Sequence, residues 1–127
     1  MIQEYKDLLL KDLCARLLYG LMVDRLGVPR KVLSINPYDN ASLLLDRGEY
    51  TPAWYRIDDV KPYLRPMSSM TEEEEIEYDA TFATIKTDGH YDSTMTHKSF
   101  DFLNAHHFDY RGLIEKGLAI EAPEGMY

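Results

Sequence analysis

The sequence is poor in cysteine, with Cys14 as the only one among 127 residues. A lone thiol excludes an intramolecular disulfide and a cysteine-rich zinc site. Long apolar runs are also missing near the N-terminus, where the longest is Leu8-Leu9-Leu10. Such a short run predicts neither a membrane span nor a signal peptide. We therefore expect a cytoplasmic protein, because a free thiol fits a reducing compartment.

Positive charge is scarce in the second half of the chain. Residues 1–70 hold ten Lys/Arg against nine Asp/Glu, a net charge of +1, whereas residues 71–127 hold four against thirteen, a net charge of −9. An acidic surface repels phosphates, so direct binding of DNA or RNA is not expected. The same field would attract a basic partner, including a protein groove that normally holds nucleic acid.

Metal-binding motifs are missing as well. All four histidines, His90, His97, His106 and His107, lie within eighteen residues. They form neither an H-E-x-x-H motif nor a helical pair at i, i+4. Adjacent residues on a helix point about 100° apart, so His106 and His107 are poorly placed to share one ion. We predict no metal site and no cofactor.

Catalytic motifs are equally scarce. The seven glycines are scattered and predict no phosphate-binding loop. The residue types present allow two arrangements of a catalytic nucleophile: Cys14 with a distant histidine, and Ser93 or Ser99 with His97 and Asp101. The glycines of a nucleophile elbow flank neither serine. We predict a protein with no catalytic residues that is not an enzyme.

Apolar residues make up 45% of the chain, which is enough for a packed core in one domain spanning residues 1–127. Tyrosine and methionine are frequent, with ten and six copies. They line core edges, where a tyrosine hydroxyl stays in water, or they form a contact surface. The sequence leaves both interpretations open.

Residues 1–19 are predicted to form a helix. Apolar side chains recur at three- and four-residue spacing and form one stripe: Leu9, Leu10, Leu13, Cys14 and Leu17. The charged residues lie mostly off that stripe: Lys6, Lys11, Asp12 and Arg16. Cys14 is therefore expected on the buried side, and Gly20 is expected to end the helix.

Residues 20–66 are predicted to form a small curved antiparallel sheet of about four strands. Turn signals at Gly27-Val28-Pro29 and over residues 36–40 separate short apolar runs. The fourth strand is expected over residues 54–64, with Pro62 breaking it or placing it at an edge. The meander is either open or curled into a barrel.

Residues 67–127 are predicted to be acidic and mainly helical. Thr71 and Glu74 have capping-box spacing at the start of a helix, and Glu72 to Glu75 lie at its positive end. Asp88-Gly89 indicates a loop or a short hairpin. Farther on, Ser99 is expected to cap one helix, with the adjacent histidines near its end, where positive charge is favourable.

The C-terminal stretch is expected to contain one more helix. Asp109 is predicted to cap it, residues 110–116 to form it, and Gly117 to end it in the left-handed conformation. Leu118 would then fold back onto the apolar face, and AIEAP would be a short strand or an extended tail. The fold class predicted from these elements is α+β.

Three blocks of the sequence, LLLKDLCARLLYG, IDDVKPYLRPMSSMTEEEE and FDFLNAHHFDYRGLIEKGLAIEAPEGMY, carry a resemblance to known proteins. Together they cover about half of the chain, and they resemble a group of short proteins from gut Bacteroidetes and their phages and mobile elements. The chain departs from the group at Leu18, where proline is usual, and at Phe102, where tryptophan is usual. Residues 21–53 and 80–98 follow no group pattern. The resemblance implies no activity, cofactor or site.

These observations favour a small acidic interaction protein that binds and modulates a host or phage protein, with nucleic-acid mimicry as the sharper form of this hypothesis. Small acidic proteins of mobile elements often act in this way, which is an analogy only. The candidate interaction surface combines aromatic anchors with acidic residues: Trp54, Tyr55, Tyr63, Glu72, Glu73, Glu75 and Tyr110. The alternatives are a nucleotide-type small-ligand binder, which requires a concave pocket, or an enzyme of another kind. A homodimer through the helix stripe or the tyrosines also remains open.

Overall fold

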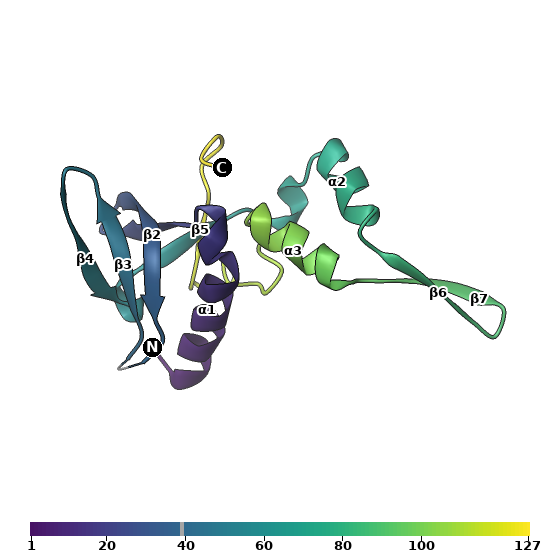
Figure 1. Ribbon diagram of the computed structural model, residues 1–127, viewed down its shortest axis with the longest axis horizontal. Coiled ribbons are helices and arrows are strands. Elements are labelled where there is room, and N and C mark those ends of the chain that lie inside the picture. The colour runs from purple at the N-terminus through teal and green to yellow at the C-terminus, as the bar shows by residue number, and fades with distance from the viewer. Residues whose placement is uncertain (39) are drawn as a thin grey trace.

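A computed structural model describes residues 1–38 and 40–127 and shows an α+β fold (Figure 1). The predicted N-terminal helix is confirmed as α1, Gln3–Arg16, followed by a 3-10 turn, Leu17–Tyr19, and by Gly20 at φ 71°. Five strands follow: β1 Met22–Arg25, β2 Val28–Asn36, β3 Ser42–Arg47, β4 Tyr50–Arg56 and β5 Lys61–Leu64. The last strand, β8, is Ile120–Glu121.

These strands form one six-stranded sheet in the order β4-β3-β2-β1-β5-β8. All of its pairs are antiparallel except β5 with β8, which are parallel. No pairing among the described residues joins β4 to β8, so the sheet stays open. The prediction of about four strands was therefore too low, and the barrel considered as one form of the sheet is not present.

The predicted fourth strand, residues 54–64, is interrupted. Ile57–Asp59 form a 3-10 turn that separates β4 from β5. The Ile57 amide donates to the Ala41 carbonyl at 3.0 Å, and both Ile57 and Val60 are buried. Turning the chain here places both apolar side chains in the core, whereas a continuous strand would point residues three apart to opposite faces.

The second half contains α2, Glu72–Asp79, then β6, Ala83–Thr87, and β7, His90–Thr94, and then α3, His97–Ala105. The predicted capping box is confirmed: Glu74 N donates to Thr71 Oγ1 at 3.2 Å, and Thr71 N donates to Glu74 Oε1 at 3.1 Å. The Asp88-Gly89 signal is a hairpin turn between β6 and β7, with φ values of 47° and 80°.

In the last part of the chain, one predicted helix is present but starts earlier than expected, and a second predicted helix is absent. The helix expected after Ser99 begins at His97, and Ser99 instead accepts a hydrogen bond from the Thr96 amide at 3.0 Å. Residues 110–116 form no helix, because Gly112 has φ 72°. The Asp109 carboxylate nevertheless accepts from backbone amides as predicted, those of Leu113 and Ile114 at 2.8 and 2.9 Å. The expected left-handed Gly117 is present at φ 74°, and Leu118 is buried as predicted.

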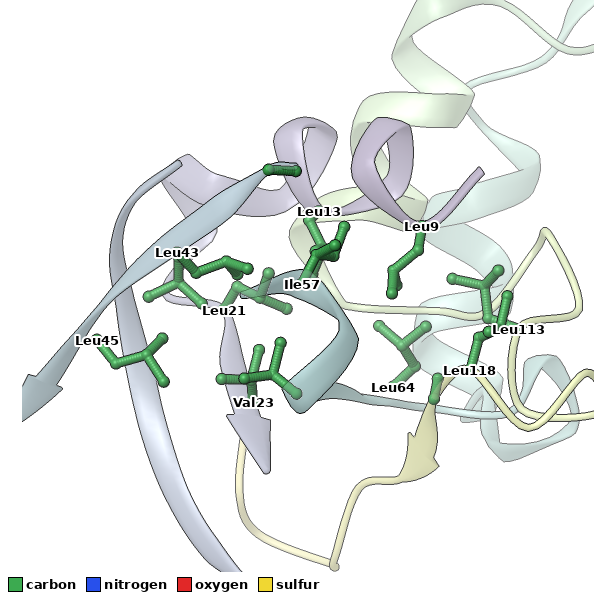
Figure 2. Packing of buried hydrophobic residues seen from close by; sticks show 14 residues of the cluster. Leu9, Leu13, Leu21, Val23, Leu43, Leu45, Ile57, Leu64, Leu113 and Leu118 are labelled. Atoms are coloured by element: carbon green, nitrogen blue, oxygen red, sulfur yellow. The ribbon is translucent and has the colours of Figure 1, made fainter. Parts of the chain in front are cut away.

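The core lies between α1, the sheet and the C-terminal turns. Figure 2 shows Leu9 and Leu13 of α1 directed toward the sheet and the turn that contains Ile57, and Leu113 and Leu118 beside Leu64. Each such buried leucine contributes roughly 1.5–3 kcal/mol. Because its members come from both ends of the sequence, the core joins the N-terminal helix, the sheet and the tail into one body.

Two predictions about the face of α1 are corrected. Asp12 and Arg16, expected off the apolar stripe, are fully buried, whereas Cys14, expected inside, is exposed. Leu9, Asp12, Leu13 and Arg16 follow the three- and four-residue spacing of a single helical face. The inner face of α1 is therefore part apolar and part ionic.

The turn predicted over residues 36–40 includes residue 39, which lies outside the described residues. Beside it, the Asn36 side chain accepts from the Tyr38 amide at 3.0 Å, and Ala41 N donates to Tyr38 O at 3.1 Å. Both contacts are those of a turn. In the described part of the chain, no helix has the length and apolar character needed to cross a membrane.

Candidate functional site

Residues 71–96, here named the acidic arm, comprise α2 and the β6–β7 hairpin. In Figure 1 the arm lies to the side of the sheet, and the hairpin points away from the rest of the molecule. Eight of its residues are Asp or Glu and one is Lys, so it carries a net charge of −7 out of −8 for the whole chain. Its exposed acids on α2 are Glu72, Glu73, Glu75, Glu77 and Asp79.

Glu74 is the one glutamate of the run 72–75 that is not exposed, and it ties α2 to the body. Arg65 donates to both of its carboxylate oxygens at 2.7 Å. The Arg65 guanidinium also lies 4.2 Å from the centre of the Phe108 ring, and His106 Nδ1 lies 3.3 Å from Glu74 Oε2. The hydrogen bonds from Arg65 lower the pKa of Glu74 to about 2, so this carboxylate stays ionised.

Aromatic rings connect the arm to α3. Tyr78 stacks on Phe102 with ring centres 5.7 Å apart, and its edge meets Phe82 at 5.1 Å. The Tyr78 hydroxyl lies 3.7 Å from the sulfur of Met95, and burial raises its pKa. Aromatic pairs of this geometry contribute about 0.5–1.5 kcal/mol beyond area burial.

Hydroxyl groups close the base of the hairpin. Thr81 Oγ1 donates to Ser99 Oγ at 2.8 Å, and Thr96 Oγ1 donates to the Thr81 carbonyl at 2.7 Å. Ser99 is buried, so its hydrogen bonds are shielded from water. The two chain segments entering and leaving the hairpin are thus held together where they meet α3.

Beyond this base the hairpin is solvent-exposed. All ten residues of β6 and β7 are exposed, including Ile85 at 50% and Tyr91 at 68%. Lys86 Nζ lies 5.6 Å from the centre of the Tyr91 ring across the two strands. The hairpin therefore presents both of its faces to solvent or to a partner.

A buried ionic network lies under the C-terminal turns. Arg16 donates to Asp12 through two nitrogens, at 2.9 and 3.1 Å, and to the Phe108 carbonyl at 2.6 Å. Arg111 also donates to Asp12, at 3.0 Å, and to the Tyr110 hydroxyl, which in turn donates to Asn104. Asp12 thus places one negative charge between two arginines, and the bonds from Arg16 to Phe108 and from Arg111 to Asp12 join the tail to α1.

His107 is buried, with 2% of its surface exposed. Its Nε2 lies 2.8 Å from the Tyr19 carbonyl, its ring stacks on Tyr127 at 3.8 Å, and its Nδ1 has no hydrogen-bond partner. Burial, with smaller contributions from Arg16, His106 and Arg65, lowers the pKa of His107 to about 4. The prediction that positive charge is favourable at this position is therefore wrong for His107, which is neutral near pH 7.

A hollow of about 380 Å³ lies between the segment after β5 and the C-terminal tail. Its polar lining includes Arg65, Ser69, Thr71 and Glu124. Arg65 already binds Glu74 with both terminal nitrogens, so it is not free to hold an anionic ligand. The hollow has the volume of a ligand site. Ser69 Oγ donates to the Pro66 carbonyl and Thr71 Oγ1 accepts from the Glu74 amide, so these two lining groups are already engaged.

The nucleophile arrangements considered from the sequence do not assemble. Cys14 is exposed, and local desolvation raises the pKa of its thiol, which disfavours a thiolate. Ser99 Oγ is bonded to Thr81 and Thr96, while Ser93 lies on the hairpin. In the part of the chain that the structure describes, no three His, Cys, Asp or Glu side chains are grouped to hold a metal.

The predicted interaction surface does not form one patch. Glu72, Glu73 and Glu75 share the exposed start of α2, whereas Trp54, 52% exposed, lies on the edge strand β4 at the opposite end of the molecule (Figure 1). Tyr63 is buried and donates to Asp24, which contradicts its expected exposure.

The other two predicted aromatic anchors are half-buried. The guanidinium of Arg25 lies 4.9 Å from the centre of the Tyr55 ring. Tyr110 bonds Asn104 and contacts Arg16 and Arg111. These tyrosines therefore serve packing, and only the acidic part of the predicted surface is clustered.

Sequence reasoning missed the arm's exposed apolar residues, Ile76 at 71%, Ile85 at 50% and Tyr91 at 68%. The signal for β6 and β7 was the Asp88-Gly89 pair, but nothing in the sequence showed that neither face of the hairpin would be covered. The chain matches no protein-family model, no curated protein and no solved structure.

Proposed function

We propose that this chain is a small, non-enzymatic interaction protein whose acidic arm binds a basic surface on a partner protein. The observation that carries the proposal is the segregation of charge: residues 71–96 hold −7 of the net charge of −8, on a segment that extends away from the body. Such a field concentrates a positively charged partner and speeds its encounter.

Exposed apolar groups accompany these charges. Ile76 lies within the acidic helix, and Ile85 and Tyr91 lie on the hairpin, each at least half exposed. Protein interfaces combine apolar and aromatic anchors with a polar rim, whereas a merely solvated acidic helix needs no such residues. The base of the arm is held by the Arg65–Glu74 pair and by Tyr78, which limits the ordering required on binding.

We further propose that the partner belongs to a host or phage, by analogy with other small acidic proteins of mobile elements. In its sharper form, the acidic arm imitates nucleic acid and occupies a basic groove. Salt separates this form from ordinary docking, because ionic attraction between exposed groups is strongly screened in half-molar salt. Binding that persists in half-molar salt would exclude mimicry as the main driving force.

The test is affinity capture from host cells with matched charge variants. One variant carries Glu72, Glu73 and Glu75→Gln, and the control carries Glu4, Glu115 and Glu121→Gln, which removes three exposed carboxylates elsewhere. The wild type and the control are expected to retain one basic protein that the arm variant loses. Equal recovery by all three proteins would contradict the proposal.

The alternative is a binder of small ligands at the 380 Å³ hollow. A thermal-shift screen with nucleotides and divalent metals addresses it, because a ligand at 100 times its dissociation constant adds about 2.7 kcal/mol of stability. A shift that disappears in a Ser69→Ala variant would favour this alternative. No shift with any compound would count against it.

A further inference from the structure

The β6–β7 hairpin has two open edges. Its strands pair from Ala83–Thr94 to Thr87–His90 and belong to no larger sheet. Positive φ at both Asp88 and Gly89 is the mark of a two-residue type I′ turn. In such a hairpin the pair flanking the turn exchanges backbone hydrogen bonds, and every second pair does the same. The backbone groups of the intervening residues, Thr84 and Lys86 on β6 and Tyr91 and Ser93 on β7, therefore point outward.

The two edges differ in their protection against another strand. Lys86 places a charge on the β6 edge, which is a common way to block edge pairing. On the main sheet, the edge strand β4 contains Pro52, which lacks an amide donor. β7 has the sequence His-Tyr-Asp-Ser-Thr, with neither proline nor lysine, and its one charged residue, Asp92, would repel an acidic strand but not a basic one. Among these three edges, β7 is the one open to strand addition.

Stability points the same way. A lone two-stranded hairpin is marginal in water, and a third strand is generally required for independent stability. Every residue of β6 and β7 is exposed, so the hairpin gains nothing from burial against the body. A third strand along β7 would satisfy the outward groups of Tyr91 and Ser93 and cover part of the Tyr91 ring.

We infer that the β7 edge accepts an extended, basic segment of the partner protein as a third strand, an inference that rests on the proposed function of the acidic arm. Charge identifies the chemistry of the segment: Asp92 on β7 and the exposed glutamates of α2 favour lysine or arginine side chains. A second copy of this chain is disfavoured, because it would bring another arm of charge −7 to the same place.

The experiment uses the full-length chain and a fluorescent peptide of alternating lysine and valine as the probe. A second peptide has the same side chains but N-methyl groups on alternate residues, which keep the charge and remove the donors of one edge. Fluorescence anisotropy is expected to show at least tenfold weaker binding of the N-methylated peptide. In NMR spectra, the amides of Tyr91 and Ser93 should become protected from exchange on binding of the first peptide.

Two proline variants form a matched pair, because Ser93 and Thr84 face each other across the hairpin and both point their amides outward. Ser93→Pro should weaken binding of the unmodified peptide at least tenfold, whereas Thr84→Pro should change it less than twofold. Circular dichroism and thermal unfolding establish that both variants are folded.

Equal binding of both peptides, or equal effects of both prolines, would overturn strand addition while leaving a basic partner for the arm in place. Absence of binding by either peptide at millimolar concentration would also overturn the inference, and the capture experiment would still decide the proposed function. Sedimentation tests the other occupant. A dimer of the wild type that the Ser93→Pro substitution dissociates would show that a second copy of this chain, and not a basic segment, pairs with β7.

Discussion

One carboxylate, that of Asp12, pairs with both Arg16 and Arg111 inside the protein. Replacing it by asparagine leaves two arginines without their counter-charge, one of them fully buried. Breaking a buried ion pair in this way typically costs 3–5 kcal/mol. We expect Asp12→Asn to lower the free energy of unfolding by about that amount in urea denaturation.

Asp7→Asn is the matched control, because Asp7 is an exposed residue of the same helix whose carboxylate accepts from Gln3. It should change stability by less than about 0.5 kcal/mol. Similar losses in the two variants would show that the Asp12 network is no more valuable than a surface contact.

His107 predicts a pH effect whose sign follows from its burial. Its pKa in the folded protein is about 4, below the ordinary 6.5, so the unfolded chain binds more protons between these values. Stability should therefore fall as the pH drops from 6.5 to 4, by at most about 1.4 kcal/mol per pH unit, and this contribution should level off below 4.

His107→Asn separates this contribution from other titrations. Asparagine tolerates the left-handed conformation of this residue, φ 59°, but has no titrating ring. The variant should be less stable at pH 7 because it loses the stack on Tyr127, and its decline between pH 6.5 and 4 should be shallower. A parallel decline in both proteins would mean that other groups govern this range.

At the scale of the element, α2 depends on Glu74 for both its cap and its attachment. Glu74→Gln keeps an acceptor for the Thr71 amide but removes the charge that Arg65 binds bidentately. We expect the variant to lose about 1–2 kcal/mol of stability. Relative to the wild type, its amide exchange should become faster across residues 71–82 and change less in β2 and β3. Glu75→Gln, at an exposed position of the same turn, should leave the exchange rates unchanged.

Acid should reproduce the effect of that variant. Because the pKa of Glu74 is lowered from 4.5 to about 2, its contribution is complete above pH 4.5 and is lost as the pH falls toward 2. This range lies mostly below that of His107. Protection factors of the α2 amides, which correct for the intrinsic pH dependence of exchange, should stay constant between pH 6.5 and 5. A fall of these factors in that range would contradict the assignment to Glu74.

Elements with a local chemical signature could be predicted from the sequence. The Thr71–Glu74 capping box, the Asp88-Gly89 turn and the left-handed Gly117 depend on neighbouring residues only, and all three are present. The burial of Asp12 and Arg16 could not be predicted from charge, because the residues that cover this ion pair, Phe108 and Arg111, lie more than ninety residues away in sequence. Their helical spacing with Leu9 and Leu13 was the available signal.

The candidate site was predictable in its charge but not in its shape. The glutamates of α2 are consecutive in sequence, so their clustering was evident. Trp54, Tyr63 and Tyr110 were expected beside them, but the order of strands sends Trp54 to the far edge and packs Tyr63 inside. Aromatic composition alone does not distinguish a core tyrosine from an interface tyrosine.

At the scale of the whole molecule, the hairpin should be separable from the body. Replacing residues 84–93 by Asn-Gly connects Ala83 to Thr94, a facing pair, through a new two-residue turn. Because the removed strand residues are exposed, the thermal midpoint should change by less than about 3 °C. A cooperative loss of folding would show that the hairpin supports the core.

The same variant should lose its partner in the capture experiment while keeping α2 and its glutamates. Capture comparable to that of the full chain would assign the contact to α2 alone. Both proteins keep the six-stranded sheet with Trp54 at its far edge. A partner that binds through the sheet would therefore be captured equally by both.

The hydrogen bonds from Arg16 to the carbonyls of Leu103 and Phe108 also bear on the order of events during synthesis. The helix that contains Arg16 leaves the ribosome long before residues 103–111 exist. Until those residues are synthesised, the remaining hydrogen bonds of the Arg16 guanidinium and the Asp12 carboxylate can be made only with water. Packing of the helix on the sheet would then bury both groups with hydrogen bonds unsatisfied. A nascent chain stalled before residue 103 should therefore be digested by protease, and resistance should appear only once the last turns are made.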